Sequence, residues 1–198
     1  MKNPRLLVSS FSLLFALSAS NLYAEEHVQH GVHEHGVAKL AVAIGTEGVE
    51  ITLASPAANI VGFEHVPTTD DDKTAVDDAV KKLQAGDELF ILNAEAECQL
   101  QDTEVLSGLL GDEMPAHDDH KHAQQDDHKH DHATGDAHND VDVAWSYTCA
   151  KPAELKEIAV KLFAAFPNGF QRINAEWVTD KGASAMELTQ DTTISLTQ

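Results

Sequence analysis

The stretch VAKLAVAIGTEGVEITL, residues 37–53, indicates the fold class more clearly than any other part of the chain. Apolar side chains occupy every second position in both of its halves: Ala38, Leu40, Val42 and Ile44, then Val49, Ile51 and Leu53. A period of two is typical of a strand that buries one face. Because Glu47-Gly48 between the halves has the composition of a turn, we expect a β-hairpin.

A helix is expected after the hairpin, beyond a loop over residues 54–67. Thr69 is a suitable N-cap, and Asp70 to Asp72 would place negative charge in the first turn, where the helix dipole favours it. Apolar residues at helical spacing follow: Ala75, Val76, Ala79, Val80 and Leu83. Gly86 is expected to end this helix. A short strand over residues 89–92 and a second through Cys98 should follow.

The C-terminal part has the same kinds of pattern. Residues 141–149 alternate and predict a strand that leads to Cys149. Pro152 suits the first turn of a helix, and apolar residues at helical spacing follow it: Leu155, Ile158, Ala159, Leu162 and Phe163. Strands over residues 171–179 and 184–189 complete the chain. Together, the expected strands and helices predict a single α+β domain over residues 25–198, with a mostly antiparallel sheet and two helices.

A long His/Asp-rich loop is expected to interrupt this compact body over residues 112–140. Its 29 residues include seven His and nine Asp or Glu. The motif DDHKH occurs at residues 118–122 and again at residues 126–130. Because such a segment cannot bury enough apolar surface to order itself, we expect it to be disordered.

The N-terminus and the cysteines indicate export. Residues 1–24 have the pattern of a cleavable signal peptide, with Lys2 and Arg5 before an apolar stretch and Ala24 before the expected cut. The alternative is an uncleaved anchor; no other stretch could span a membrane. Since exported chains meet an oxidising environment, Cys98 and Cys149 predict one disulfide, with two buried free thiols as the alternative.

Charge narrows the classes of partner. The chain has 33 acidic residues against 13 Lys and Arg, a formal net charge of −20. Nucleic-acid binding needs a basic surface, so no nucleic-acid partner is expected. Attachment to anionic lipid is disfavoured for the same reason. Cations are the ligands that this charge favours.

Histidine supplies metal ligands in two groups. The first precedes the hairpin, at His27, His30, His33 and His35, and the i, i+2 spacing of His33 and His35 would let both rings share one ion. His65 and His138 are further candidates for a site in the folded body. The loop group predicts several weaker, exchangeable sites: His117, His120, His122, His128, His130 and His132. The alternatives are ordinary surface histidines, a frayed terminus around His27 and His30, and a solvated spacer.

Zinc is the expected metal, with Cu²⁺ and Ni²⁺ as alternatives, because imidazole and carboxylate groups suit all three. Binding needs neutral imidazole, so weakly held ions should be released as the pH falls through about 6.5. The sequence lacks H-E-x-x-H, G-x-S-x-G, P-loop and dinucleotide motifs, and we do not expect an enzyme. A zinc-dependent hydrolase with Glu34 or Glu64 as general base is a distant alternative.

Four stretches carry a family resemblance: GVHEHG at residues 31–36, SPAANIVGFEH at 55–65, AECQL at 96–100 and WSYTC at 145–149. Together they resemble the ZrgA-type family of zinc-regulated, His-rich periplasmic proteins of Gram-negative bacteria. His33, His35, His65 and, less directly, His138 match the family's His motifs, whereas the individual loop histidines do not carry over.

The resemblance implies a periplasmic zinc-binding accessory protein. It would collect zinc and support delivery to an ABC-type importer, through the importer's substrate-binding protein or its permease. A zinc buffer that sequesters excess metal and a nickel or copper chaperone are the alternatives. Induction when zinc is scarce would favour acquisition, and induction when zinc is abundant would favour sequestration.

Overall fold

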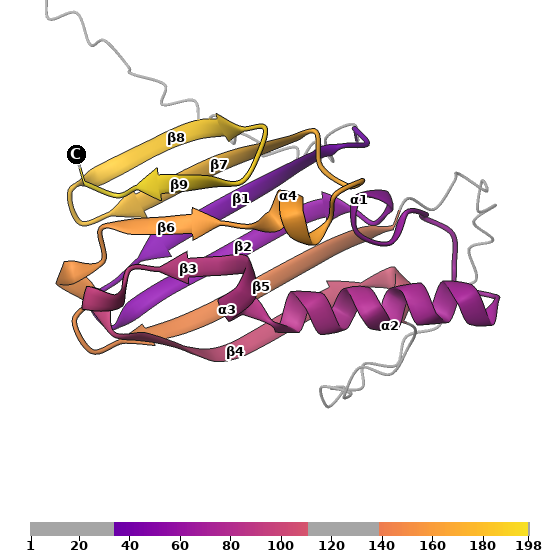
Figure 1. The fold of residues 1–198 in the computed structure, drawn as a ribbon, viewed down its shortest axis with the longest axis horizontal. Helices are drawn as coiled ribbons and strands as arrows, with labels where there is room; N and C mark the ends of the chain where they lie inside the picture. The colour runs from indigo at the N-terminus through magenta and orange to yellow at the C-terminus, as the bar shows by residue number, and fades with distance from the viewer. Residues whose placement is uncertain (1–33, 111–138, 198) are drawn as a thin grey trace, which may run out of the picture. The chain divides into compact units, whose positions relative to one another are not determined.

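A six-stranded sheet is the frame of the fold in the computed structural model, which describes residues 34–110 and 139–197 (Figure 1). Its strands are β1 (Val37–Ile44), β2 (Gly48–Pro56), β4 (Cys98–Ser107), β5 (Asp140–Cys149), β7 (Arg172–Thr179) and β8 (Gly182–Leu188). They lie side by side in the order β4-β5-β2-β1-β7-β8. The β1–β7 pair is parallel and the other neighbours are antiparallel, so the sheet is mixed.

The predicted hairpin over residues 37–53 is confirmed as the β1–β2 pair. Leu40 lies opposite Leu53, and Val42 lies opposite Ile51, so the alternating apolar residues share one face. These side chains are at most 2% exposed. The burial follows from the period of two, which sends successive side chains to opposite faces.

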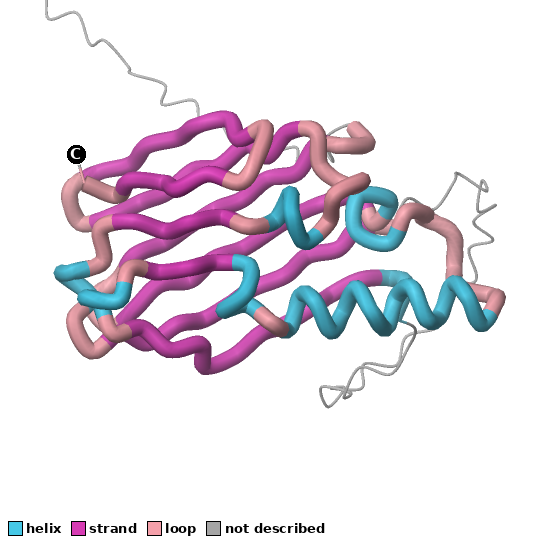
Figure 2. Tube along the Cα trace, in the orientation of Figure 1, coloured by secondary structure: helices cyan, strands magenta, loops and turns pink. Residues whose placement is uncertain are grey.

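A three-stranded sheet and the helix α2 (Asp70–Gln84) contribute the other side of the core (Figures 1 and 2). The small sheet consists of β3 (Phe90–Leu92), β6 (Glu157–Val160) and β9 (Thr192–Ser195), in the order β3-β6-β9. Fully buried side chains come from both sheets and from α2: Leu40, Ile51, Trp145 and Ile173, then Phe90, Ile158 and Ile194, and Leu83. The indole N–H of Trp145 donates to the carbonyl of Leu83 at 2.7 Å, which fixes α2 against β5.

The first predicted helix is confirmed, together with its N-cap. The Thr69 hydroxyl accepts from the backbone N–H of Asp72, and the Asp72 carboxylate accepts from the backbone N–H of Thr69, which forms a capping box. Its C-terminal boundary differs slightly from the prediction. The helix ends at Gln84, and Gly86 begins the short helix α3 (Gly86–Leu89), where a Cβ would lie 2.6 Å from Trp145 Cδ1. Gly86 therefore permits close packing against the core.

The second predicted helix, from Pro152 to Phe163, is wrong. The structure has a 3₁₀ turn at Pro152–Glu154, strand β6, and only a four-residue helix, α4 (Leu162–Ala165). The apolar residues of this stretch also fit a period of two, because Ile158, Val160 and Leu162 are all buried. Pairing with β3 and β9 satisfies the backbone of β6 on both sides, and tertiary pairing prevails over the helical spacing.

The expected loop over residues 54–67 contains structure at its start. Strand β2 continues to Pro56, and the one-turn helix α1 (Ala58–Val61) follows. The described residues are thus mostly β-strand in a mixed sheet, with four α-helices, of which α1, α3 and α4 each have four residues. The α+β prediction is confirmed in part, since one substantial helix is present among these residues instead of two.

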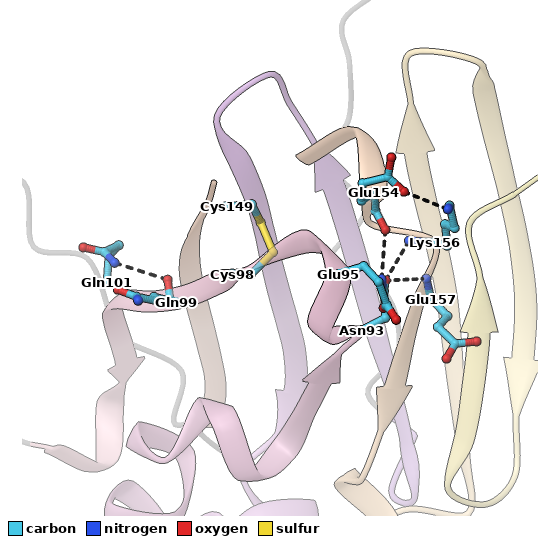
Figure 3. The surroundings of a disulfide bond; sticks show 9 residues. All are labelled: Asn93, Glu95, Cys98, Gln99, Gln101, Cys149, Glu154, Lys156 and Glu157. Carbon is cyan, nitrogen blue, oxygen red and sulfur yellow. Dashed lines mark hydrogen bonds and ion pairs between the residues drawn. A yellow bond between two sulfur atoms is a disulfide. The ribbon is translucent and has the colours of Figure 1, made fainter. Parts of the chain in front are cut away.

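Cys98 and Cys149 form the predicted disulfide (Figure 3). They face each other at one end of the antiparallel β4–β5 pair. At the other end, Ser107 lies opposite Val141, so the predicted His/Asp-rich loop begins and ends there. The loop falls almost wholly in residues 111–138, outside the described residues, although Asn139 and Asp140 belong to the folded body. Closing a chain segment of 51 residues stabilises the fold by about 4 kcal/mol in the chain-entropy model.

Candidate metal centre

His35 lies in a tight turn that leads into β1. The turn requires Gly36 at φ +85°, a conformation that side chains with a Cβ rarely adopt. The carbonyl of Gly36 accepts from the backbone N–H groups of Gln171 and Arg172, at 2.7 and 2.9 Å. The start of β7 therefore holds this turn in place.

Asn59 of α1 fixes the same turn from the other side. Its Oδ1 accepts from the backbone N–H of Gly36 at 2.6 Å, and its Nδ2 donates to the carbonyl of Val37 at 3.0 Å. Nδ2 also donates to the hydroxyl of Ser55 at 3.1 Å. Asn59 is only 3% exposed, so these bonds satisfy a polar group that burial would otherwise penalise.

Glu64 follows α1 and reaches back to His35. Gly62 ends α1 in the left-handed conformation, at φ +90°, and redirects the chain into Phe63, Glu64 and His65. The Nε2 atom of His35 then lies 3.0 Å from Oε1 of Glu64. The imidazole side chain is 67% exposed, whereas the carboxylate side chain is 17% exposed. An accessible imidazole and a largely covered carboxylate thus meet at the surface.

Asn139 brings a third segment to this place. Its Nδ2 donates to the backbone carbonyl of Glu64 at 2.6 Å, and its own carbonyl accepts from the backbone N–H of Ala57 at 2.9 Å. Asn139 immediately precedes β5. The start of β1, the loop after α1 and the start of β5 are therefore held together by direct hydrogen bonds.

His65 has a different partner from His35. Its Nε2 lies 3.5 Å from Oδ2 of Asp72, and its ring packs against Phe63 with the centroids 4.6 Å apart. The backbone N–H of Thr69, with its hydroxyl and the N–H of Thr68, lowers the pKa of the Asp72 carboxyl below its ordinary value. Asp72 therefore stabilises the start of α2 as well as facing His65.

Glu34, the other carboxylate beside His35, pairs with Arg172. The Arg172 Nη2 atom lies 3.2 Å from Oε2 of Glu34, and its Nε lies 3.7 Å from Oε2 of Glu187. Among the described residues, no group of three or more His, Cys, Asp or Glu side chains could hold a metal ion. The described contacts are instead two separate His–carboxylate pairs.

Most of the predicted metal ligands lie outside the described residues. These are His30, His33, His138 and the loop residues His117, His120, His122, His128, His130 and His132. His33 and His138 are nevertheless informative by their place in the sequence, because they directly precede Glu34 and Asn139. The two segments that contact Glu64, before β1 and before β5, thus each border a predicted ligand in the sequence.

The model of the ZrgA family of zinc uptake proteins matches residues 32–196. The chain belongs to this family. Curated protein sequences gave no match. The match confirms the resemblance and covers the stretches that carry it, from residue 32 of the first stretch through residues 55–65, 96–100 and 145–149. It gives this ZrgA family member a role related to zinc.

The members of the ZrgA family are zinc uptake proteins. Among the described residues, no helix is long and apolar enough to cross a membrane. The assignments of individual metal ligands stay predictions, because the family match identifies no residues.

Three residues of this region were not among the candidate metal ligands from the sequence. Glu64 was considered only as the general base of a hydrolase, although its position directly before His65 was a signal. Nothing in the sequence indicated the roles of Asn59 and Asn139, because their hydrogen-bond partners are 23 and 75 residues away along the chain. Such contacts appear only when the chain is folded.

Proposed function

We propose that this ZrgA family member is a periplasmic zinc-binding protein that supplies an ABC-type importer. Its tight site would lie where the start of β1, the loop after α1 and the start of β5 come together. His33 and His35 would be its principal ligands. The observation that supports this place is the contact of His35 with Glu64, whose carbonyl is in turn held by Asn139. His65 and His138 are the further candidate ligands.

The position of His35 suits reversible binding of a cargo ion. Its ring is largely exposed, so zinc can reach it, while its backbone is fixed through Gly36 and Asn59. A ligand whose backbone is already ordered loses little conformational entropy when the ion binds. This favours tight binding at His35.

The histidines of residues 112–140 would serve as a collector. Six of the seven would do so, His117, His120, His122, His128, His130 and His132, since His138 is a candidate ligand of the tight site. His30, near the N-terminus, would be an additional weak ligand. Neighbouring aspartates raise the local concentration of cations. Zinc collected there could pass to the tight site and then to the importer's binding protein or permease. Residues 1–24 would be removed on export to the periplasm.

The double substitution His33→Ala, His35→Ala tests the tight site. The variant should lose the highest-affinity zinc site and keep weaker sites, because the loop histidines are untouched. Zinc titration of the metal-stripped mature chain, in competition with a chelator, measures the affinity. A matched variant, His128→Ala with His130→Ala, removes two imidazoles at the same spacing from the loop and should leave the tightest site intact. Tight binding that survives the first substitution contradicts the assignment.

A further inference from the structure

The carboxylate of Glu64 lies where a second ligand of an ion bound to His35 is needed. His35 Nε2 and Glu64 Oε1 are 3.0 Å apart. Two ligands at roughly 2.0–2.1 Å from a tetrahedral zinc ion are about 3.3 Å apart. A zinc ion could therefore replace the hydrogen bond with little movement of either side chain.

We propose that Glu64 is a direct zinc ligand and shares its ion with His35. This inference rests on the proposed function, because it adds a ligand to the same site. Glutamate oxygen and histidine nitrogen are both ordinary zinc ligands. The carboxylate also contributes the negative charge that an exposed imidazole lacks.

The backbone around both groups is already fixed. Asn59 holds the Gly36 N–H and the Val37 carbonyl next to His35, and Asn139 holds the carbonyl of Glu64. Gly62 sets the direction of the chain before Glu64. Ligands carried on such a preorganised backbone need little reordering to bind an ion.

The two neighbouring carboxylates have other roles. Glu34 faces the guanidinium of Arg172, whose Nη2 lies 3.2 Å from Oε2 of Glu34. Asp72 accepts from the backbone N–H groups of Thr68 and Thr69, at 3.2 and 3.1 Å, and caps α2. Of these three carboxylates, Glu64 is the one that is placed against His35.

The substitution Glu64→Gln separates direct ligation from mere orientation of the His35 ring. A carboxylate that only orients a ligating histidine accepts a hydrogen bond from it, and the Gln carbonyl can still do so. If the carboxylate is a direct ligand, replacing it with Gln removes its negative charge, and the site loses most of its metal affinity. Glu34→Gln is the matched control, because it removes the same charge from the residue next to His35.

The experiment uses the full mature chain, with zinc in competition with a chelator and Co²⁺ as a spectroscopic probe. His35→Ala and Glu64→Gln should each weaken the tightest zinc site by about 100-fold or more, and Glu34→Gln should weaken it by less than about threefold. Glu64→Gln should also change the visible absorption spectrum of the first bound Co²⁺, whereas Glu34→Gln should not.

Two other results are distinguishable. If His35→Ala weakens the site but Glu64→Gln weakens it by less than about 100-fold, or leaves the cobalt spectrum unchanged, Glu64 is not a ligand and the inference is overturned. If His35→Ala leaves the tightest affinity unchanged, the proposed site itself is wrong.

Discussion

At the scale of single residues, Asn59 links the stability of the fold to the proposed zinc site. Replacing it with Ala would leave the buried N–H of Gly36 without its partner, at a cost of about 1–3 kcal/mol in the free energy of unfolding. The turn that carries His35 would also lose one of its supports. We therefore expect Asn59→Ala to weaken the tightest zinc site by about tenfold or more, measured by chelator competition.

Asn93→Ala provides the control for this prediction. Asn93 also makes several hydrogen bonds, to Glu95, Glu154, Lys156 and Glu157, but it lies near the disulfide (Figure 3). Its loss should lower the free energy of unfolding without changing zinc affinity. Equal effects of the two substitutions on zinc affinity would show that Asn59 acts only through general stability.

At the scale of elements, α2 should respond to pH through its capping box. The pKa of Asp72 is lowered from 3.8 in the folded state, chiefly by the backbone N–H of Thr69. Because the folded pKa lies below the unfolded value, the ionised carboxylate stabilises the fold fully above about pH 3.8. This stabilisation is lost as the pH falls from 3.8 through the folded pKa.

Thermal unfolding of Asp72→Asn between pH 7 and pH 2 measures this effect. The variant should have a lower Tm than the parent at pH 7, and the difference should shrink below pH 3.8 as the parent carboxylate becomes protonated. Asp71→Asn removes the same charge from the same helical turn but lies outside the capping box, so its effect should be smaller. A Tm difference that stays constant over the whole range would contradict the prediction.

The elements themselves show what the sequence could predict. The β1–β2 hairpin and the capped helix α2 were predictable because local period and local capping decide them. Strand β6 was not predictable, because the apolar residues around Ile158 and Val160 fit both the helical period of about 3.6 and the strand period of two. Its pairing with β3 and β9 joins segments far apart in the sequence. Strand β9 was not predicted either, because its four residues are too few to show a clear alternation of apolar and polar side chains.

At the scale of the whole molecule, the proposed site depends on the topology of the sheet. The spacing of His33 and His35 and the GFEH stretch at residues 62–65 were visible in the sequence. The approach of Glu64 to His35 was not, because it depends on α1 and on the place of β5 beside β2. Sequence reasoning could therefore name candidate ligands but not their pairing.

The same topology makes the His/Asp-rich segment removable. Ser107 of β4 lies opposite Val141 of β5, so the chain leaves and re-enters the sheet at neighbouring points. Deleting residues 116–137 would leave residues 111–115 and His138 to join Leu110 to Asn139. A connection of this length is ordinary between antiparallel strands. The disulfide at the far end of the pair remains in place.

Zinc titration by calorimetry, of the metal-stripped mature chain beside this deletion variant, tests most directly whether the folded body holds the specific site. The account predicts that the deletion variant keeps one tight site and loses several weaker ones, because His33, His35 and Glu64 are unchanged. Loss of all zinc binding on deletion would contradict the account, since the loop histidines would then be the whole metal-binding apparatus.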